Sequence, residues 1–424
     1  MRCPVLLRLF RAASGIACGS LALCALPACG DTVDWLGHDR MNSDELRPLT
    51  GPQEYPNALR DVLGKSDEEI ASKIEATFQQ LFYGDKFNEA IFYTDAYDAD
   101  RAYIWDTLHG QVRTEGMGFG MMITVQLDKQ DEFDRLWRYA KEWHEHTSGP
   151  KQGYFVSFCD VPWSDKPVFC SDPFGLQQLA MALLFAHGRW GSDTGTIDYG
   201  AEAIALLEVM QHKETLNGGV DDGVTNIFDP ETKLVFDIPN VEAADTTRPS
   251  VEMPAYYELW AQATGDPFWA EAAESAREHW RRTAHPITGL IPVRAHFDGT
   301  PVTGSANFDS ETYRTLLNLA LDQIWFGVDP WQVEEANRLL AFFSRQGIDW
   351  YGGAYTLDGV LIEARDPALV VTNGVVGLVA TREDRDEYIE AAWAAEPATG
   401  LPRYYPGLLH LLSLITLSGQ FRVY

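Results

Sequence analysis

The chain has 424 residues, of which 46% are hydrophobic and 12% aromatic, and this is enough apolar material for one large domain or two ordinary ones. The formal net charge is −29, and such a surface repels phosphate backbones and anionic lipid headgroups. The composition argues against extensive disorder and against nucleic acid as a partner, whereas a neutral or cationic saccharide is compatible with it.

Residues 1–29 have the pattern of an export signal, with arginines in the first eleven residues and an apolar run from Ile16 to Ala28 that is too short to span a bilayer. The run ends in Leu26-Pro27-Ala28-Cys29, which resembles the bacterial lipobox, in which the cysteine is lipidated. Several acyl chains on Cys29 would anchor the protein, and cleavage without lipid is the alternative. We expect residues 30–56 to be a tether and the location to be the bacterial cell envelope, either the periplasm or the outer membrane.

Two cysteines, Cys159 and Cys170, belong to the expected folded part of the chain. An oxidising compartment would permit them to pair, and the prolines between them suit a stapled loop. Two separate buried thiols are the alternative, and neither interpretation makes these cysteines catalytic.

Apolar residues recur at helical spacing along nearly the whole chain. Ser66 and Glu69 form a capping box before the first such pattern, and a second pattern covers residues 133–140. Eleven or twelve helices are expected in all; the later ones are predicted at 177–190, 198–212, 254–264, 267–283, 311–326, 330–346, 368–381, 385–395 and 404–417.

Short turns such as 264–267 alternate with long loops at 147–175, 214–250 and 284–310. Helix pairs with short turns at one end and long loops at the other are typical of a closed ring of helical hairpins. No linker interrupts residues 57–424, so we predict one all-α domain. Some β-hairpin structure is expected in the long loops, for instance at 233–237, in a peripheral place.

The most informative segment is 112–122, Val-Arg-Thr-Glu-Gly-Met-Gly-Phe-Gly-Met-Met, which leads into an apolar helix. Glu115 lies at the start of this helix, where partial desolvation would raise its pKa and suit it to donate a proton. The three glycines allow another chain segment or a sugar ring to approach the backbone. Composition alone favours the alternative, a buried structural glutamate at a tight helix start.

This segment resembles the general-acid motif of glycoside hydrolase family 8, and the segments 180–191, 253–260, 403–405 and 417–424 resemble later parts of the same family in the same order. The resemblance covers about residues 57–424 and is closest to the branch of reducing-end xylose-releasing exo-oligoxylanases. It implies an (α/α)6 barrel with a cleft at its loop-rich face and an inverting mechanism with Glu115 as the acid. In that mechanism the two carboxyl groups stand roughly 6.5 to 9.5 Å apart.

The same resemblance places the catalytic base in the segment Phe308–Arg314, where Glu311 stands in place of the family's aspartate and Arg314 would orient it. Asp309 is a second candidate for the base. The structural alternative is that an acid at a helix start is favoured by the helix dipole. Asp172 is expected to support the cleft, because it lies two residues before Phe174, which replaces another aspartate of the family.

Two other positions depart from the family pattern. Val251 and Glu252 stand where the family has a tyrosine and a histidine, and the segment 365–369 lacks the histidine that the branch uses to recognise a reducing end. Candidates for contact with sugar are Tyr103, Trp105, Phe119, Phe174, Tyr313, Arg365 and Tyr405. For the aromatic residues, packing in the core is the favoured alternative.

No metal site or cofactor is expected. His144 and His146 are two residues apart and would point in different directions on a helix, which favours a solvated helix end. The leading hypothesis is an envelope glycoside hydrolase that acts on β-linked oligosaccharides, xylo-oligosaccharides first and β-glucans next. A weakened lipoprotein that binds oligosaccharide without cleaving it is the main alternative, and a lyase or epimerase is a third.

Overall fold

The computed structural model describes residues 41–160, 171–192, 195–243 and 245–424. The export signal, Cys29 and Cys170 lie outside the described residues, so lipidation and the pairing of Cys159 with Cys170 remain predictions. Cys159 itself is buried on a short strand, and its Sγ lies 3.4 Å from the carbonyl oxygen of Trp143.

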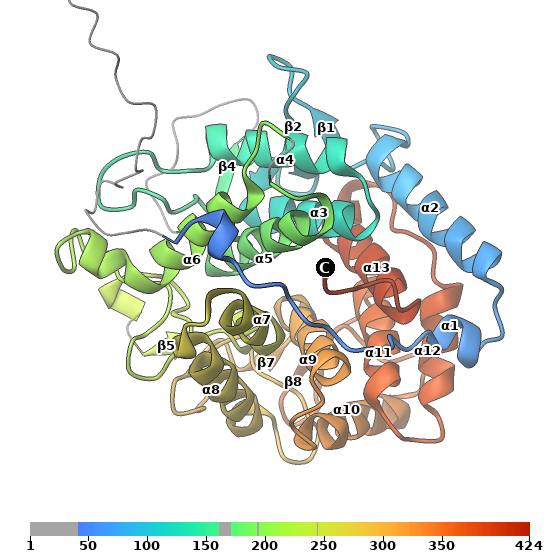
Figure 1. Cartoon of the computed structure of the whole chain (residues 1–424). Coiled ribbons are helices and arrows are strands. Elements are labelled where there is room, and N and C mark those ends of the chain that lie inside the picture. The colour runs from blue at the N-terminus through green and yellow to red at the C-terminus, as the bar shows by residue number, and fades with distance from the viewer. Residues whose placement is uncertain (1–40, 161–170, 193–194, 244) are drawn as a thin grey trace, which may run out of the picture. The chain divides into compact units, whose positions relative to one another are not determined.

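Two concentric rings of helices form the unit Met41–Tyr424, which confirms the predicted (α/α)6 barrel (Figure 1). In the inner ring α3 contacts α5 and α13, α9 contacts α7 and α11, and α11 contacts α13. The inner helices are α3 (Thr114–Gln126), α5 (Pro173–Trp190), α7 (Pro254–Thr264), α9 (Tyr313–Trp325), α11 (Pro367–Val379) and α13 (Tyr404–Leu417). The outer helices are α2 (Asp67–Tyr83), α4 (Gln130–Trp143), α6 (Tyr199–Leu216), α8 (Pro267–Thr283), α10 (Trp331–Gln346) and α12 (Arg385–Ala394), and a short α1 (Ala58–Asp61) precedes them.

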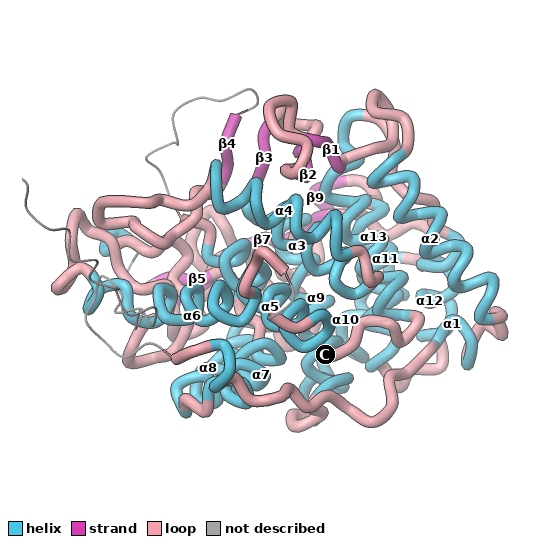
Figure 2. Tube along the Cα trace, turned by 45° about the horizontal axis from the view of Figure 1, so that its top comes forward, coloured by secondary structure: helices cyan, strands magenta, loops and turns pink. Residues whose placement is uncertain are grey.

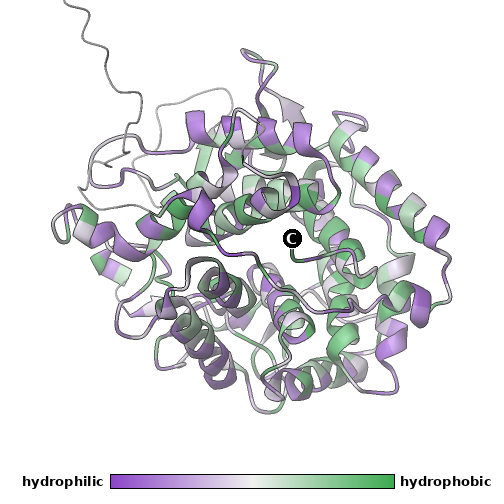
Figure 3. Ribbon diagram, viewed as in Figure 1, coloured by the Kyte–Doolittle hydropathy of each residue, from purple (hydrophilic) through white to green (hydrophobic). Residues whose placement is uncertain are grey.

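The sequence patterns explain the two rings. In α4 the residues Phe133, Leu136, Trp137 and Ala140 recur at helical spacing and are buried, while the opposite face is polar. In α3 every residue except Glu115 is buried, as an inner helix with neighbours on all sides requires. Figure 3 shows the same contrast, with apolar residues concentrated on the inner helices.

In the part of the chain that the structure describes, nine short strands lie in the connections between helices, and Figure 2 shows where they lie. Four strands form an antiparallel sheet in the order β1-β2-β3-β4, which the expectation of peripheral hairpins missed. The first three precede α3 in the chain and β3 leads directly into it, whereas β4 follows α4. Around residues 233–237 there is an isolated bridge, Phe228 to Val235. The strands are β1 (Phe92–Thr94), β2 (Ala102–Asp106), β3 (Gln111–Arg113), β4 (Phe158–Asp160), β5 (Thr246–Thr247), β6 (Ala295–His296), β7 (Asn307–Phe308), β8 (Ala354–Thr356) and β9 (Leu361–Glu363).

The described part of the expected tether packs against the ring. The backbone N–H of Arg47 donates to the carbonyl of Ala263 at 2.9 Å, and the N–H of Thr50 donates to the side chain of Gln262 at 2.8 Å. Residues 41–56 thus belong to the same compact unit as the helices. Within the described residues, no helix has both the length and the apolar character needed to cross a bilayer.

Candidate active site

Glu115 is positioned by the junction between β3 and α3. Strand β3 runs directly into the helix, and Glu115 is in its first turn. The backbone N–H of Thr114 donates to Ser157 at 3.1 Å, and its hydroxyl donates to the carbonyl of Val156 and lies 2.7 Å from Nδ1 of His144. His144 is completely buried, so the expectation of a solvated helix end was wrong; a histidine at the end of α4 instead supports the start of α3.

The glycines after Glu115 allow close packing around it. A Cβ on Gly116 would lie 2.5 Å from the hydroxyl oxygen of Tyr404, and one on Gly118 would lie 2.5 Å from Cβ of Gln178. Contacts this short are not tolerated, so side chains of α13 and α5 can reach the α3 backbone only because these positions lack a side chain. The close approach expected from the sequence is therefore made by the protein itself.

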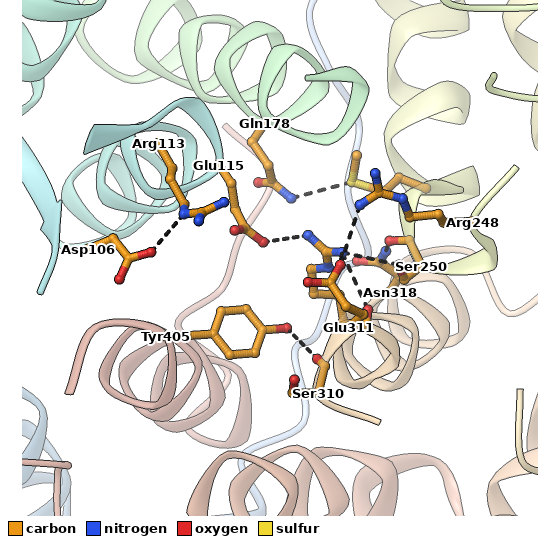
Figure 4. A network of polar contacts seen from close by, with 12 residues as sticks. Asp106, Arg113, Glu115, Gln178, Arg248, Ser250, Ser310, Glu311, Asn318 and Tyr405 are labelled. Carbon is orange, nitrogen blue, oxygen red and sulfur yellow. Dashed lines mark hydrogen bonds and ion pairs between the residues drawn. The ribbon is translucent and has the colours of Figure 1, made fainter. Parts of the chain in front are cut away.

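Arg314 at the start of α9 joins the two predicted catalytic carboxylates. Its guanidinium forms an ion pair with Glu115 through Nη1 and a second one with Glu311 through Nη2, the latter at 3.0 Å. Figure 4 shows Glu115 and Glu311 converging from different helices. The side chain of Arg314 is only 5% exposed, and that of Glu115 16%, whereas Glu311 is 52% exposed.

The two carboxyl groups have opposite electrostatic environments. Burial raises the pKa of Glu115 to about 7, and Arg314 opposes this rise without cancelling it, while Glu311 and Asp172 add to it. The Arg314 guanidinium lowers the pKa of Glu311, and Arg248 acts in the same direction. Near neutral pH one group can therefore hold a proton while the other is ionised, which is the division of labour that acid and base catalysis needs.

Asp309 and Asp172 are nearby but have structural contacts. The carboxylate of Asp309 accepts the backbone N–H of Glu311 at 2.9 Å and so caps the short 3-10 helix Ser310–Thr312. Asp172 precedes α5, where burial raises its pKa and the backbone N–H of Gly175 opposes this rise. Of the two candidates for the base, Glu311 is the one that lines the cavity described below.

A pair of arginines, Arg248 and Arg294, lies near Glu311, joined through Asp237, and the sequence did not reveal it. Arg248 Nη1 lies 3.4 Å from Glu311, and its Nε forms an ion pair with Asp237. Asp237, 4% exposed, also binds Arg294 at 2.9 Å. These residues come from long loops without periodicity, so no pattern could have indicated them.

The predicted residues meet at a cavity of about 400 Å³. Glu115, Glu311 and Tyr405 line it, and the hydroxyl of Tyr405 donates to the carbonyl of Ser310 at 2.9 Å. The sequence did not single out the other lining residues, which are Asp106, Leu108, His109, Arg113, Ser310, Asp366, Pro402, Tyr404 and Pro406.

The other candidates for sugar contact are placed elsewhere. Phe119 and Phe174 are 3% and 1% exposed and pack edge to face, and the guanidinium of Arg314 covers the Phe174 ring at 4.4 Å. Tyr313 is buried and donates to the carbonyl of Gly353 at 2.7 Å. These three rings are buried in the core beside the site and offer no free face to a sugar.

Tyr103 and Trp105 lie on β2 outside the cavity lining, where they pack against Tyr93. Arg365 is exposed, donates to the carbonyl of Ile348 at 2.8 Å and lies over the ring of Tyr351.

Two residues that depart from the family pattern are in the core. Val251 is 3% exposed and Glu252 is fully buried. The carboxyl of Glu252 accepts hydrogen bonds from Val235 N at 3.0 Å and from Thr247 Oγ1 at 3.1 Å, and burial raises its pKa to about 8. Among the described residues, no group of three or more His, Cys, Asp or Glu side chains is arranged to hold a metal ion.

Comparison with known proteins gives a consistent result. The sequence model described as Glycosyl hydrolases family 8 matches residues 92–418. The reducing-end xylose-releasing exo-oligoxylanase Rex8A of Paenibacillus barcinonensis is 37% identical over 85% of this chain and 94% of its own, and that of Halalkalibacterium halodurans is 35% identical over 88% and 95%. The structure of Rex8A complexed with xylose superimposes with a TM-score of 0.81 at 36% identity, over 88% of this chain and 98% of that one.

Proposed function

This chain belongs to family 8 of the glycosyl hydrolases and is an inverting O-glycoside hydrolase, and we propose that it hydrolyses β-linked xylo-oligosaccharides with Glu115 as the general acid and Glu311 as the general base. The observation that carries the assignment of the two roles is their opposite pKa shift in one cavity. β-Glucans are the second candidate substrate.

In the proposed reaction the carboxyl proton of Glu115 passes to the glycosidic oxygen as the bond between this oxygen and the anomeric carbon breaks. A water molecule attacks the opposite face of the anomeric carbon and gives its proton to the carboxylate of Glu311. Arg314 contacts both carboxylates and keeps them on two sides of one guanidinium group. The new hydroxyl therefore has the inverted anomeric configuration.

The substrate proposal rests on the relatives, which are named exo-oligoxylanases, and on a cavity whose size suits a short oligosaccharide. We do not extend reducing-end release to this chain. The segment 365–369 has no histidine, and Asp366 lines the cavity there, where its carboxylate accepts the N–H of Ala368 at 2.8 Å and so caps α11.

We also propose that the enzyme works in the cell envelope as a lipoprotein. The support is the arrangement of arginines, apolar run and lipobox-like segment in residues 1–29. Labelling with a fatty-acid analogue tests it: wild-type protein should take up the label and fractionate with membranes, and Cys29→Ala should do neither. An unlabelled wild-type protein would contradict the anchor and leave the enzymatic proposal untouched.

The second candidate function is oligosaccharide binding without cleavage. It is favoured by the burial of Val251 and Glu252, which removes from the cavity two positions that the family resemblance implies for the site. Calorimetric binding of xylo-oligosaccharides with no product after long incubation would support it, and measurable turnover would exclude it.

The test of the first function is Glu115→Gln. Loss of a general acid should lower kcat by about 10² to 10⁴-fold while the fold is retained. Glu335→Gln is a matched control, because Glu335 is also a buried glutamate paired with an arginine, Arg338, outside the cavity; its kcat should be unchanged. Unchanged turnover of Glu115→Gln, or a first product with retained configuration in proton NMR, would refute the assignment.

A further inference from the structure

The turn between β2 and β3 forms one wall of the cavity and has no role in the acid and base pair. Leu108 is 52% exposed and the side chain of His109 is 54% exposed, and both line the cavity. The turn is closed by a hydrogen bond from Gly110 N to Asp106 O at 2.8 Å, and the hydroxyl of Thr107 donates to the carbonyl of Leu401 at 2.7 Å. The wall is thus a fixed structure that joins two distant loops.

Asp106 fixes the orientation of the His109 ring. It is 2% exposed, and its carboxylate accepts four contacts: the backbone N–H groups of Leu108 and His109 at 3.1 and 3.2 Å, and His109 Nδ1 and Arg113 Nε, both at 2.7 Å. A carboxylate held by this many donors is an acceptor, so Nδ1 of His109 carries the proton in this contact. In the neutral form of the ring Nε2 is then the acceptor, on a half-exposed side chain that lines the cavity.

The position of this wall relative to the scissile bond follows from the carboxylates. Figure 4 shows Asp106 and Arg113 on one side of Glu115 and Glu311 on the other. A sugar chain whose glycosidic oxygen meets Glu115 while water is held by Glu311 would therefore extend past Arg113 toward the turn. A pyranose ring offers an apolar C–H face and hydroxyl groups, and Leu108 and Pro402 with His109 offer the complementary surfaces.

We propose that His109, with Leu108 and Pro402, forms a binding subsite for a sugar residue beyond the two that flank the scissile bond. This proposal rests on the proposed function. Nε2 of His109 accepts a hydrogen bond from a sugar hydroxyl, and the two apolar side chains contact the ring. His109 is a binding residue for longer substrates and takes no part in the chemical step.

The test compares kcat/KM of wild type and His109→Ala on xylo-oligosaccharides from xylobiose to xylohexaose. Loss of one hydrogen bond should lower kcat/KM about 5- to 10-fold on the longest substrate and leave it within about twofold on the shortest one cleaved. His109→Gln should recover part of the loss, because its amide oxygen can accept near the place of Nε2. A loss independent of chain length, or no loss, would overturn the proposal.

His296→Ala is the matched control. His296 also contacts an aspartate through Nδ1, Asp245 at 3.1 Å, and is 39% exposed, but it does not line the cavity. Its kcat/KM should match wild type at every chain length. Calorimetry with xylohexaose separates the subsite from the proposed hydrolysis, because it measures binding alone. If the double variant Glu115→Gln, His109→Ala binds more weakly than Glu115→Gln, the subsite is supported even if wild type hydrolyses nothing. Equal affinity of the two variants overturns the subsite.

Discussion

Replacing Arg314 with methionine removes a cation that contacts both Glu115 and Glu311. Glu115 works protonated, so the rate falls as the pH rises through its pKa of about 7. Glu311 works ionised, so the rate falls as the pH drops through its lowered pKa. Because Arg314 lowers both values, its loss should move both limbs of the pH profile to higher pH.

The size of the shift follows from the contact distances. Two unit charges about 4 Å apart interact by about 4 kcal/mol at an effective dielectric constant near 20. A neighbouring opposite charge typically lowers a carboxyl pKa by about 1 to 3 units, and the remaining arginine, Arg248, still faces Glu311. We therefore expect the alkaline limb to rise from about 7 by at least about one unit, and the acid limb to rise by less.

The assay is kcat/KM against pH, because this ratio reports the ionisations of the free enzyme. Arg314→Lys keeps a positive charge and should give a smaller shift of both limbs. It is the second variant to test if Arg314→Met fails to fold, since breaking a buried ion pair costs about 3 to 5 kcal/mol. Arg281→Met is the control: Arg281 also joins two acids, Glu278 and Asp329, but does not line the cavity. Limbs that stay in place in a folded Arg314 variant would refute the electrostatic argument.

Two further predictions concern stability. Burial raises the pKa of Glu252 in the folded protein to about 8, above its ordinary value of 4.5, so the folded protein keeps a proton that the unfolded chain loses. The free energy of unfolding should therefore fall as the pH rises between these values, by up to about 1.4 kcal/mol per pH unit. Glu252→Gln should lack this loss, so its melting temperature relative to wild type should rise with pH, and a constant difference would contradict the reasoning. Gly116→Ala should cost about 1 to 3 kcal/mol in denaturant unfolding and lower kcat, because its Cβ would meet Tyr404, whereas Gly195→Ala, which meets little, should do neither.

Helix bounds were predictable where the local signals are strong. Helices α7, α8 and α13 have the predicted bounds. Gly265, with a positive φ of 74°, ends α7, and Asp266 caps the start of α8 ahead of Pro267. Helix α6 was predicted to end at 212 but continues to Leu216. His212 has non-helical backbone angles, so the helix is kinked at this residue and resumes after it. Local spacing cannot distinguish a kink from an end.

The site was predictable only where a motif marked it. Glu115 and Glu311 are far apart in the chain, and it was the family resemblance that paired them before the structure showed their shared contact with Arg314. The contact of Arg248 with Glu311 and the burial of His144 beside Thr114 depend on segments that are distant in the chain. Patterns along a single helix or loop contain no information about such neighbours.

One side of the cavity lies where α3 and α13, the first and last inner helices, meet and close the ring, and Glu311 and Asp366 line it from the segments before α9 and α11. Glu115 and Gly116 come from one edge of this junction, and Tyr404 and Tyr405 from the other. A partial opening there would separate the catalytic parts while most of the helical hairpins stayed intact. Enzyme activity should therefore report opening of the helical ring more sensitively than the helical circular dichroism signal does. As denaturant is added, activity should be lost before the helical signal.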